Sequence, residues 1–477
     1  MSRNVNRLLL LSVVACSGDP PPTATNTGLN LRPALVYAVQ SVQTQARSVP
    51  LIAGRAAMLR VFVTASEATT ASPEVRVRLF NGLTQISSTV ITATTAGVPT
   101  AIDEGNLERS WNLMIPAAQM QPGLALIVEV DPQNTIAESS ERDNAFPASD
   151  RAALDVRVVP AARVTVVPVV TGGIEGPPRV TAANALAITD LARKLFPFPT
   201  LETFLHAPYS TTAFQDNDNP INGWFQVLQE LAALRTAEAS SAEYLGILRL
   251  ETNPELLGLA SRAHVGVSHD DIGSDADTVA AHELGHVWGL RHANCGGAGG
   301  PDATYPYPDG ATGAFGLDID RLTVMPPTKK DVMGYCSGAW ISDFHFKKVL
   351  VLQTGAALSA LQPAVIVWGR ISNGRVILQP TFRAVTRVSL PDEAGPYRVR
   401  ALDTAGRELF ALSFAGAIVE DVAGDQRIFA FAVPLPERMN VASWVISDRG
   451  SHERNVRAKT ASVERGGPNG AITRIIH

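Results

Sequence analysis

One short segment, residues 281–292, restricts the fold of this chain more than any other feature. It reads AHELGHVWGLRH and contains three histidines, one glutamate and two glycines. Positions i and i+4 share one face of an α-helix, so a helix here presents His282 and His286 side by side to one metal ion. Gly289 can adopt a positive φ, which ends the helix and lets the chain turn back. His292 then approaches the same ion from another direction.

These residue types and this spacing indicate a catalytic zinc site. Neutral imidazoles suit zinc, and a catalytic zinc ion has three protein ligands and one open position. Glu283 lies beside the ligands without belonging to them, which suits a group that accepts a proton from water at that open position. We therefore predict Zn²⁺ as the cofactor and Glu283 as a catalytic residue. The predicted metal ligands are His282, His286 and His292.

The pattern His-Glu-x-x-His-x-x-Gly-x-x-His resembles the zinc-binding consensus of the metzincin clan of metalloendopeptidases. That clan has a tight downstream turn that lays a methionine beneath the zinc site, and DVMGYC at residues 331–336 stands in the corresponding place. The resemblance implies that Met333 is the Met-turn residue. In astacin-like and serralysin-like members a tyrosine two positions later ligates zinc or stabilises the oxyanion, which implies a catalytic role for Tyr335. The alternative is that both residues simply pack in the core.

Hydrophobic patterning divides the chain of 477 residues into several domains. Residues 29–160 and 347–477 alternate polar and apolar positions between turn residues, which predicts two antiparallel β-sandwiches, the second with a less ordered tail from about residue 450. Residues 161–346 alternate strand and helix patterns, which predicts an α/β layer with a mixed sheet. The predicted fold is therefore multidomain, with an α/β metzincin-like catalytic domain between N-terminal and C-terminal β-sandwich domains.

Several residues around the histidine motif have predicted structural roles. We expect residues 259–268 to form one short strand at the edge of the mixed sheet, where an extended substrate could pair antiparallel through backbone hydrogen bonds. Asp277 is expected to cap the helix that carries the motif. His264 and His269 are expected to be hydrogen-bonded structural histidines, with substrate contact as the alternative. Trp288 is expected in the core.

A second resemblance concerns residues 128–146, VEVDPQNTIAESSERDNAF. This segment resembles the closing strands of CARDB-type immunoglobulin-like domains of bacterial surface proteins. Two roles are possible for the acidic residues in this segment: they form a solvated turn, or they bind a ligand. The residues that carry the resemblance are Asp131, Pro132, Asn134, Glu138, Glu141 and Asn144.

Further acidic residues raise the question of a Ca²⁺ site. They have no EF-hand spacing, so turn formation is the favoured role and Ca²⁺ is an unsupported alternative. These residues are Asp302, Asp309, Asp318 and Asp320, together with the DNDN segment at 216–219.

The N-terminus has the pattern of an export signal. Arg3 and Arg7 precede a short apolar run, and the following VVAC resembles a bacterial lipobox. We predict a lipoprotein signal peptide at residues 1–16, lipidation and membrane attachment at Cys16, and a flexible tether at residues 17–28. The predicted location is the bacterial cell envelope, with secretion after an ordinary signal as the alternative.

The two remaining cysteines, Cys295 and Cys336, are a candidate disulfide in an oxidising compartment. The segment between the histidine motif and DVMGYC is rich in glycine, proline and aspartate and is expected to be a long loop. A disulfide would attach this loop to the predicted Met-turn.

These features predict a zinc-dependent metalloendopeptidase that hydrolyses peptide bonds in proteins or peptides. Zinc would polarise the scissile carbonyl and lower the pKa of its bound water, while Glu283 would accept the water's proton and deliver it to the leaving amine. The alternative is a non-catalytic cell-surface adhesion protein with a structural zinc site. The net charge of −5 provides no broad basic field, so nucleic acid is not an expected partner.

Overall fold

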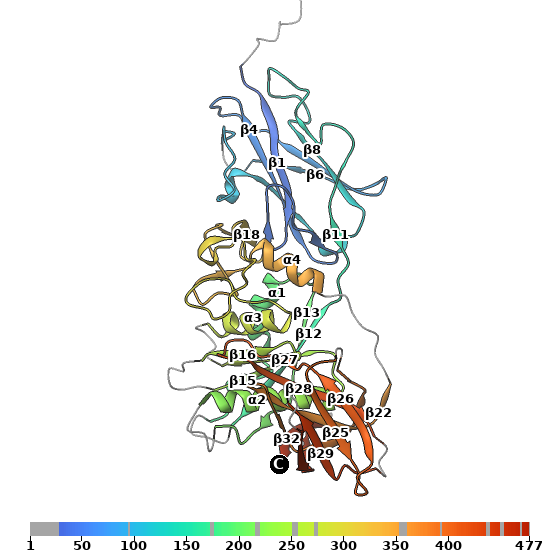
Figure 1. Ribbon diagram of the computed structural model, residues 1–477. Coiled ribbons are helices and arrows are strands. Elements are labelled where there is room, and N and C mark those ends of the chain that lie inside the picture. Colours follow the sequence, from blue (N-terminus) through green and yellow to red (C-terminus); the bar gives the residue numbers. More distant parts are fainter. Residues whose placement is uncertain are drawn as a thin grey trace, which may run out of the picture.

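The computed structural model describes residues 28–93, 96–171, 176–214, 220–249, 256–270, 275–352, 360–391, 394–435, 439–448, 453–467 and 470–476. Three parts lie in a row, with the N-terminal part at one end, the candidate catalytic part in the middle and the C-terminal part at the other end (Figure 1). The predicted signal peptide, Cys16 and the DNDN segment lie outside the described residues. No helix in the described ranges has both the length and the hydrophobicity to cross a bilayer.

The N-terminal part is an antiparallel β-sandwich. Its elements are β1 (Leu31–Val39), β2 (Val42–Gln43), β3 (Leu51–Ile52), β4 (Ala57–Ala65), β5 (Val75–Asn81), β6 (Thr84–Ile91), η1 (Leu107–Arg109), β7 (Trp111–Ile115), η2 (Ala117–Gln119), β8 (Leu124–Val130), β9 (Ala145–Phe146), β10 (Ala152–Ala153) and β11 (Val156–Arg157). One sheet has the order β1-β4-β7 and the other β10-β8-β5-β6, with β9 beside β8. Val75, Val77 and Leu79 of β5 are buried in the core between them, as the period-two pattern predicts.

The central part contains a six-stranded mixed sheet. Its elements are β12 (Ala162–Val170), α1 (Ala185–Leu195), β13 (Leu201–Leu205), β14 (Tyr209–Ser210), α2 (Pro220–Ala237), β15 (Glu243–Leu248), β16 (Gly258–Ser261), β17 (Val265–His269) and α3 (Ala276–Val287). The strand order is β13-β12-β15-β17-β16, with β14 beside β12. All pairings are parallel except that of the edge strand β16 with β17. Helices α1 and α3 pack in one core cluster against this sheet, and α2 packs in another.

Two local predictions for this part were wrong. Residues 259–268 form a hairpin of two strands, β16 and β17, because the chain turns between them at His264, whose φ is 64°. Asp277 does not cap α3; it lies in the first turn, and Asp275 is the cap residue. A carboxylate in a first turn still interacts favourably with the positive end of the helix dipole.

The chain after α3 returns across the central part toward the N-terminal sandwich. Its elements are η3 (Pro308–Gly310), β18 (Phe315–Asp318), β19 (Thr323–Met325), β20 (Lys330–Asp331), β21 (Ala339–Trp340) and α4 (Asp343–Leu352). Strand β18 pairs with β19 and also with β2 of the N-terminal part. The N-terminal sandwich and the central part are therefore joined by backbone hydrogen bonds.

The C-terminal part is a second β-sandwich. Its elements are β22 (Leu361–Ser372), β23 (Arg375–Leu378), β24 (Phe382–Arg387), β25 (Tyr397–Leu402), β26 (Glu408–Phe414), β27 (Ala417–Ile418), β28 (Gln426–Pro434), β29 (Ser443–Ser447), β30 (Glu453–Arg457), β31 (Ser462–Gly466) and β32 (Ala471–Ile476). The sheets have the orders β23-β22-β28-β27, with β24 beside β22, and β26-β25-β29-β30. The prediction of a less ordered tail from about residue 450 is wrong, because β30, β31 and β32 form there. Ile472 and Ile475 of β32 are buried in the same core cluster as α2.

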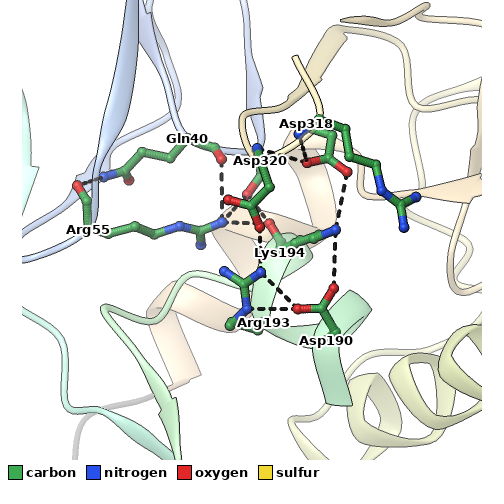
Figure 2. A network of polar contacts seen from close by, with 9 residues as sticks. Gln40, Arg55, Asp190, Arg193, Lys194, Asp318 and Asp320 are labelled. Atoms are coloured by element: carbon green, nitrogen blue, oxygen red, sulfur yellow. Dashed lines mark hydrogen bonds and ion pairs between the residues drawn. The ribbon is translucent and has the colours of Figure 1, made fainter. Parts of the chain in front are cut away.

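Arg55 links the N-terminal sandwich to the end of helix α1 (Figure 2). Its guanidinium donates to the carbonyl oxygens of Phe196 at 2.6 Å and Lys194 at 2.5 Å and to Ser41 Oγ at 2.8 Å. The two carbonyls belong to the C-terminal end of α1, where carbonyl groups lack intrahelical partners and a positive charge is favourable. Around them, α1 is joined to the end of β18 and to the turn after it by ion pairs of Lys194 with Asp318 and of Arg193 with Asp320.

We expect Arg55→Ala to destabilise the contact between the N-terminal sandwich and the central part by about 2–4 kcal/mol, because charged hydrogen bonds are lost and helix-end carbonyls become unsatisfied. The measurement is the midpoint of urea unfolding. Arg32→Ala, which removes an exposed arginine of β1, is the control and is expected to change little. Equal midpoints for the two variants would contradict the role assigned to Arg55.

Candidate metal centre

Helix α3 positions the first two histidines of the motif. His282 and His286 lie one turn apart, and both are buried. The helix ends at Val287, and Gly289 takes a φ of 92° in the following turn. His292, 1% exposed, is thereby brought back to the same place. The three predicted ligands thus come together.

Each of these imidazoles is oriented by a backbone carbonyl at its Nδ1 atom. The partners are Val332 O for His282 at 2.8 Å, Leu290 O for His286 at 3.0 Å, and Gly299 O for His292. A carbonyl oxygen only accepts, so each Nδ1 carries the ring proton and donates it. In the neutral ring Nε2 then has a free lone pair, which is the form that binds a metal.

The three Nε2 atoms converge on one point. Nε2 of His286 lies 3.0 Å from that of His282 and 3.1 Å from that of His292. Because these atoms are all acceptors, the contacts are repulsive unless a cation lies between them. Tetrahedral zinc with zinc–nitrogen distances of about 2.0–2.1 Å would hold its ligand nitrogens about 3.3 Å apart. The donor set therefore fits Zn²⁺.

A fourth candidate ligand comes from the C-terminal sandwich. Asp421 Oδ1 lies 2.7 Å from Nε2 of His292, and Asp421 Oδ2 lies 3.2 Å from Nε2 of His286. Its ligand atom and those of the three histidines all lie within 4.8 Å of one another. Burial acts to raise the pKa of Asp421, but the imidazoles, His286 first, outweigh it and hold that pKa well below its usual range.

Sequence reasoning missed Asp421. It lies 129 positions after His292, in a turn of another domain. The sequence around it, VEDVAGD, has no metal-binding spacing, so the only signal for it is the three-dimensional contact.

The pKa values of the two helix histidines shift in opposite directions. Burial lowers the pKa of His282, which keeps this imidazole neutral and able to ligate a metal. Burial also acts to lower the pKa of His286, but the Asp421 carboxylate outweighs it and raises that pKa overall.

Glu283 is buried beneath the edge of the mixed sheet. A Cβ atom on Gly258 of β16 would lie 2.1 Å from Glu283 Oε1, so only glycine at this position leaves room for the carboxyl group. Glu283 Oε2 has no hydrogen-bond partner among the described residues. Burial raises the pKa of Glu283 well above its usual range, and the charge of Asp421 adds to the effect. A carboxyl group with raised proton affinity suits proton transfer.

The predicted Met-turn packs directly under α3. A Cβ atom on Gly285 would lie 2.3 Å from the sulfur of Met333, which is fully buried. Asp331 shapes the turn by accepting from the backbone N–H of Met333 at 2.8 Å and of Ser342 at 2.9 Å. His345 pairs with Asp331 at 2.9 Å, and both side chains are fully buried.

The candidate disulfide forms, with Cys295 and Cys336 at a Cα–Cα distance of 5.7 Å. It attaches the loop after His292 to the segment that carries Tyr335. The Tyr335 ring lies beside those of His292 and His282, with centroid distances of 5.1 and 5.7 Å. Its hydroxyl donates to Asp421 Oδ1, and burial, followed by the charge of Asp421, raises the pKa of this phenol.

The other histidines near the motif have structural partners. His264 Nδ1 lies 3.0 Å from Glu243 Oε2, and His269 Nε2 lies 3.2 Å from Asp275 Oδ1. Trp288 is buried in the core, as expected.

The acidic residues outside the motif make turns and ion pairs. Asp131 accepts from the backbone N–H of Ile136, and Asp318 accepts from that of Asp320. Asp302 forms an ion pair with Lys348. In the part of the chain that the structure describes, the only group of three or more candidate metal ligands is the one formed by the three histidines and Asp421.

Comparison with known proteins adds little to this geometry. No family model and no curated protein matches the chain. The chain is similar to the CARDB domain of a Pyrococcus furiosus protein in complex with di-metal ions, with 18% identity over 27% of this chain and 92% of that chain and a TM-score of 0.16. It is also similar to a chaperone–substrate complex, with 12% identity over 52% of this chain and 40% of that chain and a TM-score of 0.20. The CARDB resemblance thus has a distant structural counterpart, and neither similarity carries an argument about function.

We expect purified protein to hold about one zinc ion per chain and His286→Ala to lose it. Replacing a residue that only contacts a metal ligand lowers metal affinity by about 10–100-fold. His286→Ala removes a ligand itself, so its loss of zinc affinity should be larger. The measurement is metal analysis after dialysis. His264→Ala, which removes an exposed histidine of the same domain, is the control and should keep its zinc. Zinc that persists in His286→Ala would contradict the assignment.

Proposed function

We propose that the protein is a zinc-dependent metalloendopeptidase of the metzincin type. The observation that carries the proposal is the pairing of a convergent three-imidazole set with Glu283, a buried carboxyl group on the same helix. The packing of Met333 against Gly285 supports the resemblance to the clan. His282, His286 and His292 would hold Zn²⁺ through their Nε2 atoms.

Each residue of the site has a distinct task in peptide hydrolysis. Zinc, when bound, supplies a Lewis acid that polarises the scissile carbonyl and makes water more acidic. Glu283 accepts the proton of the attacking water and passes it to the leaving amine. Tyr335, 48% exposed and beside two of the histidines, would donate a hydrogen bond to the developing oxyanion.

The alternative function is that of a non-catalytic surface protein with a structural zinc site. One observation favours it, since Asp421 completes a four-ligand set and structural zinc sites are closed in this way. Glu283 counts against it, because a structural site does not require a buried carboxyl group with an unpaired oxygen. Protein or peptide substrates remain the proposed partners of the site.

We expect Glu283→Gln to keep its zinc and its fold while peptide cleavage falls by about 10²–10⁴-fold, because the amide preserves the shape but cannot accept the proton. The measurement is cleavage of a fluorogenic peptide library with zinc content determined in parallel. Glu67→Gln, the same exchange at an exposed residue of the N-terminal sandwich, is the control and should cleave as wild type does.

Two outcomes would contradict the proposal in different ways. Measurable and equal cleavage rates for zinc-loaded wild type and Glu283→Gln would show that Glu283 is not the proton acceptor. If wild type, Glu283→Gln and Asp421→Ala all fail to cleave any peptide, the structural-zinc alternative is favoured.

We also propose that the protein is exported and attached to the bacterial cell envelope through a lipid on Cys16, on the basis of the VVAC pattern alone. Wild type should partition into the detergent phase, and Cys16→Ser should move to the aqueous phase, because the several acyl chains of a lipoprotein anchor far more firmly than one. Unchanged partitioning of Cys16→Ser would contradict this location.

A further inference from the structure

The edge strand of the mixed sheet is covered by a segment of the C-terminal sandwich, residues 418–421. The backbone N–H of Glu420 donates to Ala260 O at 3.0 Å, and Ser261 Oγ donates to Ile418 O at 2.8 Å. Ser261 and Val419 form an antiparallel bridge. The segment therefore lies antiparallel to β16, in the position where an added strand pairs with a sheet edge.

The C-terminal sandwich holds this segment in place. Its first residue, Ile418, is the last residue of β27, which pairs with β28, and the N–H of Val419 donates to Gln426 O at 3.0 Å. The Val419 side chain is 3% exposed and belongs to the core cluster that joins α2, the sheet and the C-terminal sandwich. Asp421 then takes a φ of 66°, a left-handed conformation that aspartate tolerates better than most residues.

The left-handed turn ends with the Asp421 carboxylate inside the metal centre. Its side chain is 3% exposed, and its oxygens lie 2.7 Å from His292 Nε2 and 3.2 Å from His286 Nε2. The Tyr335 hydroxyl donates to the same carboxylate. Thus one continuous segment both pairs with the sheet edge and reaches the point where the three imidazoles converge.

We propose that residues 418–421 are a built-in pseudosubstrate, with Asp421 as the fourth zinc ligand that closes the metal centre. This proposal rests on the proposed function and concerns its regulation. Asp421 occupies the position that water needs, and residues 418–420 occupy the edge that an extended peptide needs. The chain as described is therefore a latent form, and substrate enters only when the turn between β27 and β28 moves away from β16.

The same geometry indicates how a substrate binds. An extended peptide that replaces the segment would run antiparallel to β16 and donate a backbone N–H to Ala260 O. Binding through backbone groups favours extended polypeptides of varied sequence over small amide substrates, since the main chain provides the affinity.

The test compares full-length, zinc-loaded wild type with Asp421→Ala and Asp421→Asn. Acetohydroxamate, a small chelator that needs an open metal position, serves as the probe, and its affinity is measured by titration calorimetry. Zinc content and peptide cleavage are measured on the same samples. Asp425→Ala is the matched control, because Asp425 lies in the same turn but pairs with Arg427 at 2.7 Å.

We expect both Asp421 variants to keep zinc and to bind acetohydroxamate about 10–100-fold more tightly than wild type, within the range of typical coupling between a regulatory contact and a site. Asp425→Ala should behave as wild type. Peptide cleavage should rise by a similar factor in the Asp421 variants. Asp421→Asn preserves side-chain shape, so it provides the readout if Asp421→Ala fails to fold.

The outcomes separate this inference from the proposed function. Equal acetohydroxamate affinity in wild type and both Asp421 variants would overturn the inference. If all three proteins then cleave peptides at the same rate, the proposed metalloendopeptidase function is unaffected. Folded Asp421 variants that lose zinc would also overturn it, because Asp421 would then be an essential ligand of a structural site. Tighter acetohydroxamate binding without peptide cleavage in any variant would support the closure by Asp421 and count against the metalloendopeptidase.

Discussion

The candidate metal centre depends on the three hydrogen bonds that orient its histidines. Each Nδ1 contacts a carbonyl oxygen from a different segment: residues 331–336, the turn after α3 and the loop that follows His292. The imidazoles can therefore converge only after all three segments have reached their final positions. Two further contacts hold these segments in position. The Cys295–Cys336 disulfide attaches the loop to residues 331–336, and the buried Asp331–His345 pair fixes the turn at Met333. Both members of this pair are fully buried, so removing either one would leave the other without its polar partner, which is costly.

The two sandwiches contact the central part in different ways. The N-terminal sandwich meets it through paired strands, β2 with β18, and through Arg55 at the end of α1. The C-terminal sandwich shares a core with α2, which lies between the mixed sheet and strands such as β22 and β28. Helix α2 thus has apolar neighbours on two sides, which explains why leucines and alanines occur around most of its circumference. Because the C-terminal sandwich is packed on α2 in this way, the turn between β27 and β28 lies against β16, the edge strand of the mixed sheet.

Local patterns in the sequence predicted the parts of the fold and site that local rules determine. The i, i+4 histidines, the helix-ending Gly289 and the period-two strands follow from helix and strand geometry alone. The hairpin at residues 259–268 was missed because its turn uses His264 at positive φ, where no glycine, asparagine or proline marks a break. The strands after residue 450 were missed for another reason: their apolar residues are few and separated by charges, and Ile472 and Ile475 are buried in a core cluster that they share with the central part. Asp421 was missed because no local pattern links it to His292.

The carboxyl groups of Asp421 and Glu283 have opposite pKa shifts at one small site. Both are buried carboxyl groups close to the same imidazoles, yet the pKa of Asp421 is lowered and that of Glu283 is raised. The difference follows from contact: Asp421 touches the imidazoles directly, whereas Glu283 has an unpaired oxygen in an apolar setting beside Gly258. Two like charges this close disfavour each other, so the presence of Asp421 itself raises the proton affinity of Glu283. Movement of Asp421 out of the site would therefore have a second effect besides opening the fourth ligand position. It would also remove the second of the two influences, after burial, that raise the pKa of Glu283, and so lower that pKa.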